Sequence, residues 1–161
     1  MTHLWTPWRS TYMQEKKQKH RCIFCDAVAS SADSETLIVY RGELAFVILN
    51  RYPYTSGHLM VAPYVHVPRL AAAPEAAAAE LMNLVRRAEV ILEQVYRPDG
   101  LNIGMNLGEA AGAGIEQHIH MHVLPRWNGD ANFMTSIGQT RIIPESLEET
   151  YAKISCKFKE C

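Results

Sequence analysis

The residues best suited to chemistry in this sequence are three histidines at alternate positions, His118, His120 and His122. Apolar residues fill the gaps, and this alternation predicts a β-strand over residues 117–126, because successive side chains point to opposite faces of a sheet. The histidines then share one face, and Pro125 is expected to end the pairing because it has no amide proton. Neutral imidazole can act as nucleophile, acid, base or metal ligand near pH 7. Three in a row therefore indicate a chemical site rather than isolated structural histidines.

A glycine-rich loop, residues 108–116, leads directly into the histidine segment. Its glycines, Gly108, Gly112 and Gly114, let the backbone approach an anion closely with its amides exposed, as in phosphate-binding nests. Such a loop alone is a weak signal, because most glycine-rich loops are only flexible turns. Its position immediately before the histidines favours a phosphate-binding role.

A second candidate site begins with Cys22 and Cys25, which are separated by two residues. The pair alone is ambiguous between half of a zinc site, a redox pair and chance. A redox motif would need a thioredoxin-like strand-to-helix context, which this part of the sequence lacks. Zinc would need two more ligands, and histidines later in the chain can supply them.

With the motifs that accompany it, the histidine segment resembles the signature of the histidine-triad (HIT) family of nucleotide-processing proteins. The resemblance covers roughly residues 20–126, and the order and spacing of its motifs make it specific. Besides the histidines, the motifs are Cys22-Ile23-Phe24-Cys25, Phe46-Val47-Ile48-Leu49-Asn50, Gly57-His58-Leu59-Met60-Val61-Ala62-Pro63 with His66, and Asn106-Leu107-Gly108.

The resemblance implies nucleotidyl transfer in two steps. His120 would attack the α-phosphorus of a nucleotide, and an acceptor would then resolve the nucleotidyl-histidine intermediate. His122 and His58 would donate hydrogen bonds to the phosphate oxygens as charge develops. No metal is required for the transfer itself. The expected substrate-binding residues are Asn50 at the ribose, Phe46 in an apolar slot for the base, Asn106, Gly112, Gly114 and Ile115 around the phosphates, and Trp127 over the acceptor site.

The resemblance also assigns the cysteines. By resemblance to the zinc-bearing branch of the family, the expected metal ligands in this sequence are Cys22, Cys25, His66 and His118. Two thiolates and two imidazoles form a closed tetrahedral set, so the expected cofactor is a structural zinc ion. This assignment removes His118 from direct chemistry.

One departure from the family pattern bears on the acceptor. Many HIT hydrolases carry a glutamine about four residues before the first triad histidine, and this chain has Gly114 there. With Trp127 after the strand, the loop is similar to the dinucleoside-polyphosphate phosphorylase branch, in which a small residue leaves space for orthophosphate. The competing functions are a hydrolase of dinucleoside polyphosphates or of adenylated amines, and a nucleotide-sensing protein with incidental turnover.

The elements that position these residues read as an α+β fold with a HIT-like arrangement: an antiparallel meander of about five strands, one long helix over residues 74–96 and a C-terminal helix over residues 144–154. The helix 74–96 carries apolar residues at i, i+3, i+4 and i+7, which predicts a buried stripe against the sheet. We expect an N-terminal arm at residues 1–21, a HIT domain at 22–155 and a charged tail at 156–161.

Composition sets the remaining limits. A chain of 161 residues, 48% hydrophobic and 20% charged, is an ordinary single domain. A net charge of −1 gives no support for nucleic-acid or membrane-surface binding, and no apolar run approaches the ~20 residues of a spanning helix. With no signal-peptide pattern at its start, the chain is expected to be cytoplasmic. By resemblance it is also expected to form a homodimer.

Overall fold

The computed structural model describes residues 22–130 and 145–160. The arm expected at residues 1–21 and the segment 131–144 lie outside the described residues. The described elements, in chain order, are α2 (Ile23–Ala29), α3 (Asp33–Thr36), β1 (Ile38–Arg41), β2 (Ala45–Leu49), β3 (Leu59–Pro63), the short 3-10 helix η1 (Leu70–Ala72), α4 (Glu75–Tyr96), β4 (Gly100–Met105), η2 (Glu109–Ala111), β5 (Met121–Arg126) and α6 (Leu147–Glu160).

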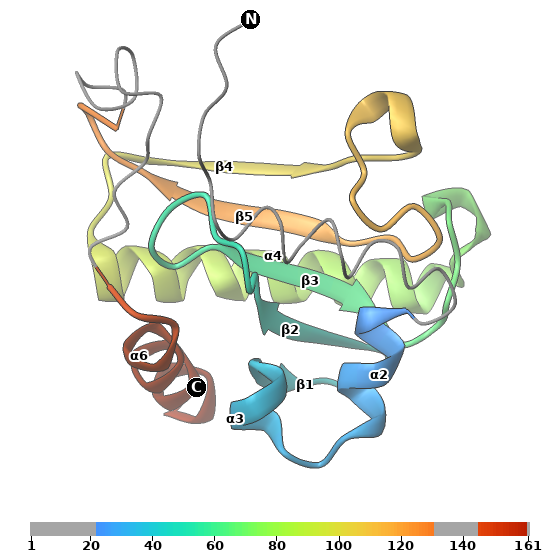
Figure 1. Cartoon of the computed structure of the whole chain (residues 1–161), viewed down its shortest axis with the longest axis horizontal. Coiled ribbons are helices and arrows are strands. Elements are labelled where there is room, and N and C mark those ends of the chain that lie inside the picture. Colours follow the sequence, from blue (N-terminus) through green and yellow to red (C-terminus); the bar gives the residue numbers. More distant parts are fainter. Residues whose placement is uncertain (1–21, 131–144, 161) are drawn as a thin grey trace, which may run out of the picture.

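The five strands form one antiparallel sheet in the order β1-β2-β3-β5-β4 (Figure 1). This confirms the expected α+β fold with five antiparallel strands, a long helix and a C-terminal helix. Strands β1 to β3 follow one another as a meander. Helix α4 then carries the chain past the sheet to β4 at the far edge, and β5 returns to pair between β3 and β4. The histidine-bearing strand β5 is therefore an interior strand, paired on both sides.

The core lies between the sheet and α4, which runs along one face of it and contacts β2, β3 and β5 (Figure 1). Every residue of β2 and of β3 is buried, so both faces of these two strands are covered. The predicted stripe of the long helix is confirmed, since its buried residues recur at helical spacing: Ala77, Leu81, Leu84, Val85, Ala88, Ile91 and Leu92. None of the helices in the described ranges meets the length and apolarity of a membrane span.

The long helix has identifiable ends. Pro74 occupies the N-cap, so the helix itself begins at Glu75, whose carboxylate lies in the favourable first turn. Arg97 takes a left-handed conformation with φ 46°, and its amide donates to the carbonyl oxygen of Glu93. The helix thus delivers the chain directly into β4.

The histidine segment differs from the sequence expectation at both ends. The strand begins only at Met121, because the amide of Ile119 donates to the carbonyl oxygen of Val67, 2.9 Å away, outside the ladder. Pro125 does not end the pairing, which continues to Arg126. The carbonyl oxygen of Arg126 accepts a hydrogen bond from the amide of Asp99 beside β4. Because neighbouring residues of a strand face opposite sides, the nitrogen of Pro125 faces away from β4, toward the side of β3. Strand β3 no longer pairs at that point, so the missing amide proton of Pro125 breaks no bond of the sheet.

The C-terminal helix extends beyond its predicted end at residue 154, into the segment expected to be a charged tail. Helix α6 continues to Glu160, and Phe158 within it is 1% exposed. Its ring stacks on Tyr40 at a centroid distance of 5.5 Å, which packs α6 beside β1. The charged residues of this segment lie on the exposed side of the helix. Because they outnumber the single buried aromatic residue, the sequence pattern did not predict a helix there.

Candidate active site and adjoining metal site

Four histidines meet where β3 and β5 pair. His118 and His120 immediately precede β5, His122 lies within it opposite Met60, and His58 immediately precedes β3. His58, His118 and His120 are buried, whereas His122 is half-buried. The rings follow one another closely, with centroids 4.9 Å apart for His120 and His122 and 5.1 Å apart for His122 and His58. The structure therefore brings the three predicted catalytic histidines together.

Hydrogen bonding determines which nitrogen of His120 can react. Its Nδ1 lies 2.9 Å from the carbonyl oxygen of His118, which can only accept a hydrogen bond. Nδ1 must therefore carry the proton, and Nε2 must carry the lone pair. This is the tautomer that a nitrogen nucleophile requires.

Hydrogen bonds also fix the tautomers of His58 and His122. The backbone amide of Tyr54 donates to His58 Nδ1 at 3.1 Å, and Asn50 Nδ2 approaches that atom at 3.3 Å. His58 therefore carries its proton on Nε2, and donates it to His122 Nδ1 at 2.9 Å. His122 is then left with a proton on Nε2, so a single chain of bonds fixes both tautomers.

Burial keeps these rings neutral. It lowers the pKa of His58 to about 3, assisted by the charges that His122 and His120 would carry. Burial, with the charge of His120, lowers the pKa of His122 to about 4. Burial also lowers the pKa of His120, against the opposing effect of its hydrogen bond to the His118 carbonyl. At pH 7 the three rings are neutral, as nucleophilic attack by imidazole demands.

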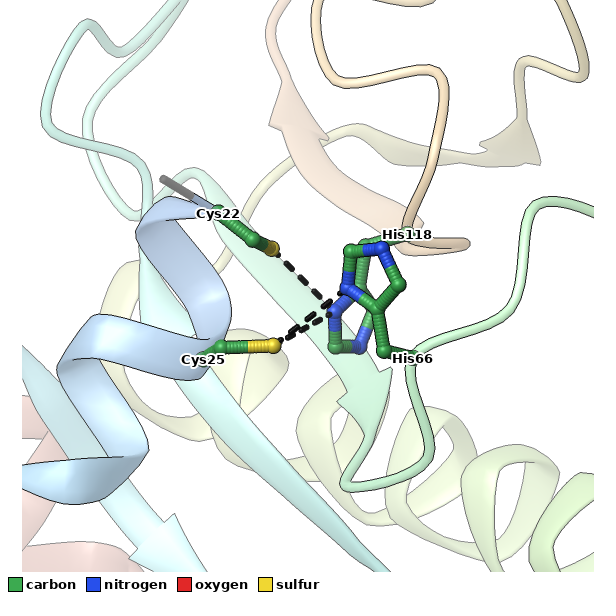
Figure 2. A group of neighbouring side chains, drawn as sticks. All are labelled: Cys22, Cys25, His66 and His118. Carbon is green, nitrogen blue, oxygen red and sulfur yellow. Dashed lines mark hydrogen bonds between the residues drawn. The ribbon is translucent and has the colours of Figure 1, made fainter. Parts of the chain in front are cut away.

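The four predicted metal ligands also converge, and Figure 2 shows the thiols of the α2 segment pointing at two imidazoles. Cys22 Sγ lies 3.3 Å from His118 Nδ1, and Cys25 Sγ lies 3.3 Å from His66 Nδ1 and 3.6 Å from His118 Nδ1. A tetrahedral zinc ion with bonds of about 2.0–2.3 Å separates its ligand atoms by about 3.3–3.8 Å. The donor set fits zinc, and these three separations lie in that range, within a cluster whose ligand atoms all lie within 4.8 Å of one another.

The surroundings of the cluster suit a metal ion as well. His118 Nε2 donates to the carbonyl oxygen of Pro63 at 2.8 Å, which turns Nδ1 toward the thiols. Burial raises the pKa of Cys22, but the hydrogen bond with His118, the amide of Cys25 and the charge of His118 lower it to about 6. A thiol that ionises this readily is prepared for metal coordination.

The glycine-rich loop forms a tight turn before the histidines. Gly108 and Gly112 both have φ 87°, a conformation that side chains rarely adopt. A Cβ atom on Gly112 would lie 3.9 Å from Asn106 Nδ2, so the loop and this amide are neighbours. Gly114 is partly exposed and Ile115 packs against the core. The predicted phosphate-binding residues are thus gathered ahead of β5.

Three other predicted substrate residues have packing contacts. Asn50 Oδ1 accepts from the amide of Tyr52, which ties it to its own loop. Phe46 is 0% exposed, with its ring stacked on Tyr64. Trp127 packs edge-on against Tyr96 at the end of α4, at a centroid distance of 6.3 Å. These contacts involve the protein's own loops and core.

Two residues at the site were missed by sequence reasoning. Phe24 lies against the rings of both His118 and His120, and the backbone of Tyr54 sets the tautomer of His58. Phe24 stands between the two cysteines, so its proximity to the triad follows once the cysteines are paired with His118. A backbone contact such as that of Tyr54 leaves no signal in the identity of the residue.

The sequence pattern of the HIT domain matches residues 31–129. The chain belongs to the HIT family. An AP-4-A phosphorylase of Mycobacterium tuberculosis is 41% identical over 157 residues, which cover 93% of this chain and 80% of that protein. The asymmetrical bis(5'-nucleosyl)-tetraphosphatase of Schizosaccharomyces pombe is 32% identical over 93 residues, covering 58% of this chain and 50% of that protein.

A crystal structure gives a further comparison. The Zn-bound histidine triad family protein from Mycobacterium smegmatis matches with a TM-score of 0.70 and 30% sequence identity, and the match covers 86% of this chain and 94% of that one. The fold and the family predicted from the sequence are therefore confirmed.

Proposed function

We propose that this chain is a HIT enzyme that cleaves dinucleoside polyphosphates such as diadenosine tetraphosphate and transfers the nucleotidyl group to orthophosphate. The observation that carries the proposal is the state of His120, a buried ring whose Nδ1 proton is held by a carbonyl oxygen 2.9 Å away. This leaves Nε2 as the nucleophile. The 41% identity to an AP-4-A phosphorylase over 93% of the chain supports the choice of substrate and acceptor.

The reaction would proceed by two displacements. His120 Nε2 attacks the α-phosphorus, a phosphorus–nitrogen bond forms, and the bond to the bridging oxygen breaks to release ATP from diadenosine tetraphosphate. An oxygen of orthophosphate then attacks the same phosphorus, the imidazole leaves, and ADP is released. Splitting one difficult displacement into two easier ones is the general advantage of covalent catalysis.

The neighbouring histidines would stabilise the charge that develops. His122 carries its outward proton on Nε2 and would donate it to a phosphate oxygen. The family resemblance predicts the same for His58, but its Nε2 proton already faces His122 Nδ1. We therefore assign His58 a positioning role, acting through His122.

The remaining substrate contacts follow from the loop and the strand ends. Asn106, Gly112, Gly114 and Ile115 would surround the phosphates, because the loop amides precede the nucleophile directly. Asn50 would bind the ribose. Phe46 would lie beneath the base, which requires its buried ring to become accessible from its place on Tyr64. Trp127 would cover the acceptor, which requires the ring to leave its contact with Tyr96.

The adjoining cluster would hold one structural zinc ion, bound by Cys22, Cys25, His66 and His118. When bound, zinc supplies a cross-link between segments distant in the sequence, and no metal acts in the transfer. Support comes from the converging donor atoms and from the zinc-bound relative of the same fold.

We further propose a cytoplasmic homodimer that uses no nucleic-acid or membrane partner. The cysteines of the described residues, Cys22, Cys25 and Cys156, are free thiols, as is usual in a reducing compartment. At the sheet edge, β4 exposes Ile103 by 43%, and Leu107 just beyond it by 46%, which favours an interface there.

Hydrolysis is the second candidate, because the relative from Schizosaccharomyces pombe carries the name of a tetraphosphatase. In that case water would resolve the intermediate and AMP would replace ADP. Hydrolysis of adenylated amines and nucleotide sensing are two further candidates, and each predicts little turnover of dinucleotides.

Product analysis tests the proposal. Wild-type protein is incubated with diadenosine tetraphosphate, with and without orthophosphate, and the nucleotides are separated. We expect ATP and ADP to form together over repeated turnovers when orthophosphate is present, and ATP release to stop at about one equivalent per active chain when it is absent. Release of AMP at the same rate under both conditions would replace phosphorolysis by hydrolysis. Negligible turnover would favour the sensor or the hydrolase of adenylated amines.

The variant Gly114→Gln gives a second arm of this test. Added bulk in the loop should crowd the incoming anion, since glycine leaves empty volume and exposed amides. We expect the ADP fraction to fall relative to AMP, or turnover to stop. An unchanged ADP fraction at an unchanged rate would remove Gly114 from the acceptor site.

A further inference from the structure

Phe24 is a fully buried aromatic residue that touches both the metal site and the nucleophile. It lies in the first turn of α2, between the two cysteine ligands, and is 0% exposed. Its ring centroid lies 5.2 Å from that of His118 and 4.9 Å from that of His120. The two displacements of the proposed reaction involve no atom of this residue.

The contacts of His120 show what Phe24 adds. The hydrogen bond from Nδ1 to the His118 carbonyl fixes one point of the ring, but a single bond leaves the ring free to tilt about it. The ring of Phe24 packs against it at an interplanar angle of 43°, and the ring of His122 meets it edge-on at 79°. Packing by these neighbours therefore determines where Nε2 points.

The position of Phe24 depends in turn on how α2 is anchored. This helix has seven residues and no side-chain cap at its start. At its C-terminal end, Arg41 donates to the carbonyl oxygen of Val28 in the last turn at 3.0 Å and to that of Ser30 just after the helix at 2.6 Å. At its N-terminal end, Cys22 and Cys25 face the imidazoles of the metal site. A bound metal would thus hold the turn that carries Phe24.

We propose that Phe24 is a positioning residue that orients the His120 ring and makes that orientation depend on occupancy of the adjoining metal site. The inference rests on the proposed function, because it assigns His120 as the nucleophile. Loss of the aromatic ring, or of the metal, should slow formation of the nucleotidyl-histidine bond while nucleotide binding persists. A misplacement of about 1 Å can cost on the order of 100-fold in rate.

The test compares Phe24→Leu with a matched control, Phe158→Leu. Phe158 is 1% exposed and stacks on Tyr40 beside β1, so its loss removes a similar buried ring away from the histidines. Zinc content, nucleotide affinity and the single-turnover rate of adduct formation are measured for both variants. We expect both to retain zinc and affinity, with the rate falling roughly 10- to 100-fold in Phe24→Leu alone.

A second measurement needs no turnover. Nitrogen-15 NMR of the wild type, without substrate, should show a His120 Nδ1 proton that exchanges slowly with water. In Phe24→Leu, and in wild type stripped of metal by a chelator, this proton should exchange faster. The chelated wild type serves the same purpose should Phe24→Leu fail to fold.

The outcomes separate the inference from the proposed function. Unchanged Nδ1–H exchange and an unchanged adduct rate in both Phe24→Leu and the metal-stripped protein overturn the inference, even if the wild type forms the adduct. Equal rate losses in Phe24→Leu and Phe158→Leu overturn it too. A weaker nucleotide affinity with a normal adduct rate in Phe24→Leu also overturns it, because Phe24 would then contact the base. Failure of the wild type to form any adduct instead refutes the proposed function.

Discussion

Four histidines with the same side chain differ in protonation and hydrogen bonding because each has different neighbours. His118 faces two thiols, so its lone pair is directed at a metal site. His120 donates to a carbonyl oxygen and keeps a free Nε2. His58 and His122 share one hydrogen bond, which is anchored by the amide of Tyr54. For single residues, the proposed function would therefore depend on tautomers that are fixed before substrate arrives.

The bond between His58 and His122 gives a first prediction. His58→Asn removes the Nε2 proton that faces His122 Nδ1, so His122 can adopt the wrong tautomer or turn away. We expect kcat to fall by roughly 100-fold with little change in KM, because the loss is one of positioning. Steady-state kinetics at pH 7 measure this effect, and an unchanged kcat would show that His122 needs no such support.

The low pKa values predict how stability changes with pH. The pKa values of His58 and His122 are about 3 and about 4, against an ordinary 6.5, so below pH 6.5 the unfolded chain binds more protons than the folded one. Stability contributed by these rings is complete above pH 6.5 and is lost as pH falls toward 4 and then 3.

Urea unfolding between pH 7 and pH 4 measures this dependence. Replacing one titrating ring by a neutral amide in His122→Gln should make the loss of unfolding free energy less steep than in the wild type. Parallel curves for the two proteins would contradict the low pKa of His122.

At the scale of elements, the site is assembled by short segments on stable supports. Strands β2 and β3 and helix α4 carry the core, whereas α2 has seven residues and η2 has three. The proposed zinc ion would attach α2 to the segment before β5. Elements that bury few apolar residues gain most from such a cross-link.

The zinc proposal gives an element-scale prediction. Wild type should contain about one zinc per chain, and Cys22→Ser should lose it and lower Tm by on the order of 5–10 °C. Cys156→Ser is the matched control, because this thiol is exposed on α6. Elemental analysis and calorimetry provide the two readouts. Absence of zinc from the wild type, or equal effects of both substitutions, would oppose the assignment.

Elements with a strong periodic pattern can be predicted from the sequence. The apolar stripe of α4 and the apolar runs of β2 and β3 appear as expected. The predicted end of α6 is too early, since Phe158 is a single apolar residue among charged ones. The predicted start of β5 is too early, because alternation continues through residues 118–120 while the Ile119 amide donates to the carbonyl oxygen of Val67. Local pattern carries no information about such distant partners.

At the scale of the whole molecule, the strand order brings distant segments to one place. Cys22, His66 and His118 come from three parts of the chain, yet their ligand atoms lie within 4.8 Å of one another together with that of Cys25. The types of these residues, with the family resemblance, are enough to predict the set. The hydrogen bonds and the packing of Phe24 are not predictable, because they depend on the arrangement of β3, β5 and α2 in space.

The proposed mechanism requires His120 to form a covalent bond to the nucleotide. The most direct measurement is mass spectrometry of wild type and His120→Ala, rapidly quenched after mixing with diadenosine tetraphosphate in the absence of orthophosphate. We predict one nucleotidyl group per active wild-type chain, mapped to His120, and none on the variant. The variant should keep nucleotide binding but lose turnover by roughly 1,000-fold or more, as expected for loss of a nucleophile. An adduct on a different residue, or turnover retained in His120→Ala, would contradict this account.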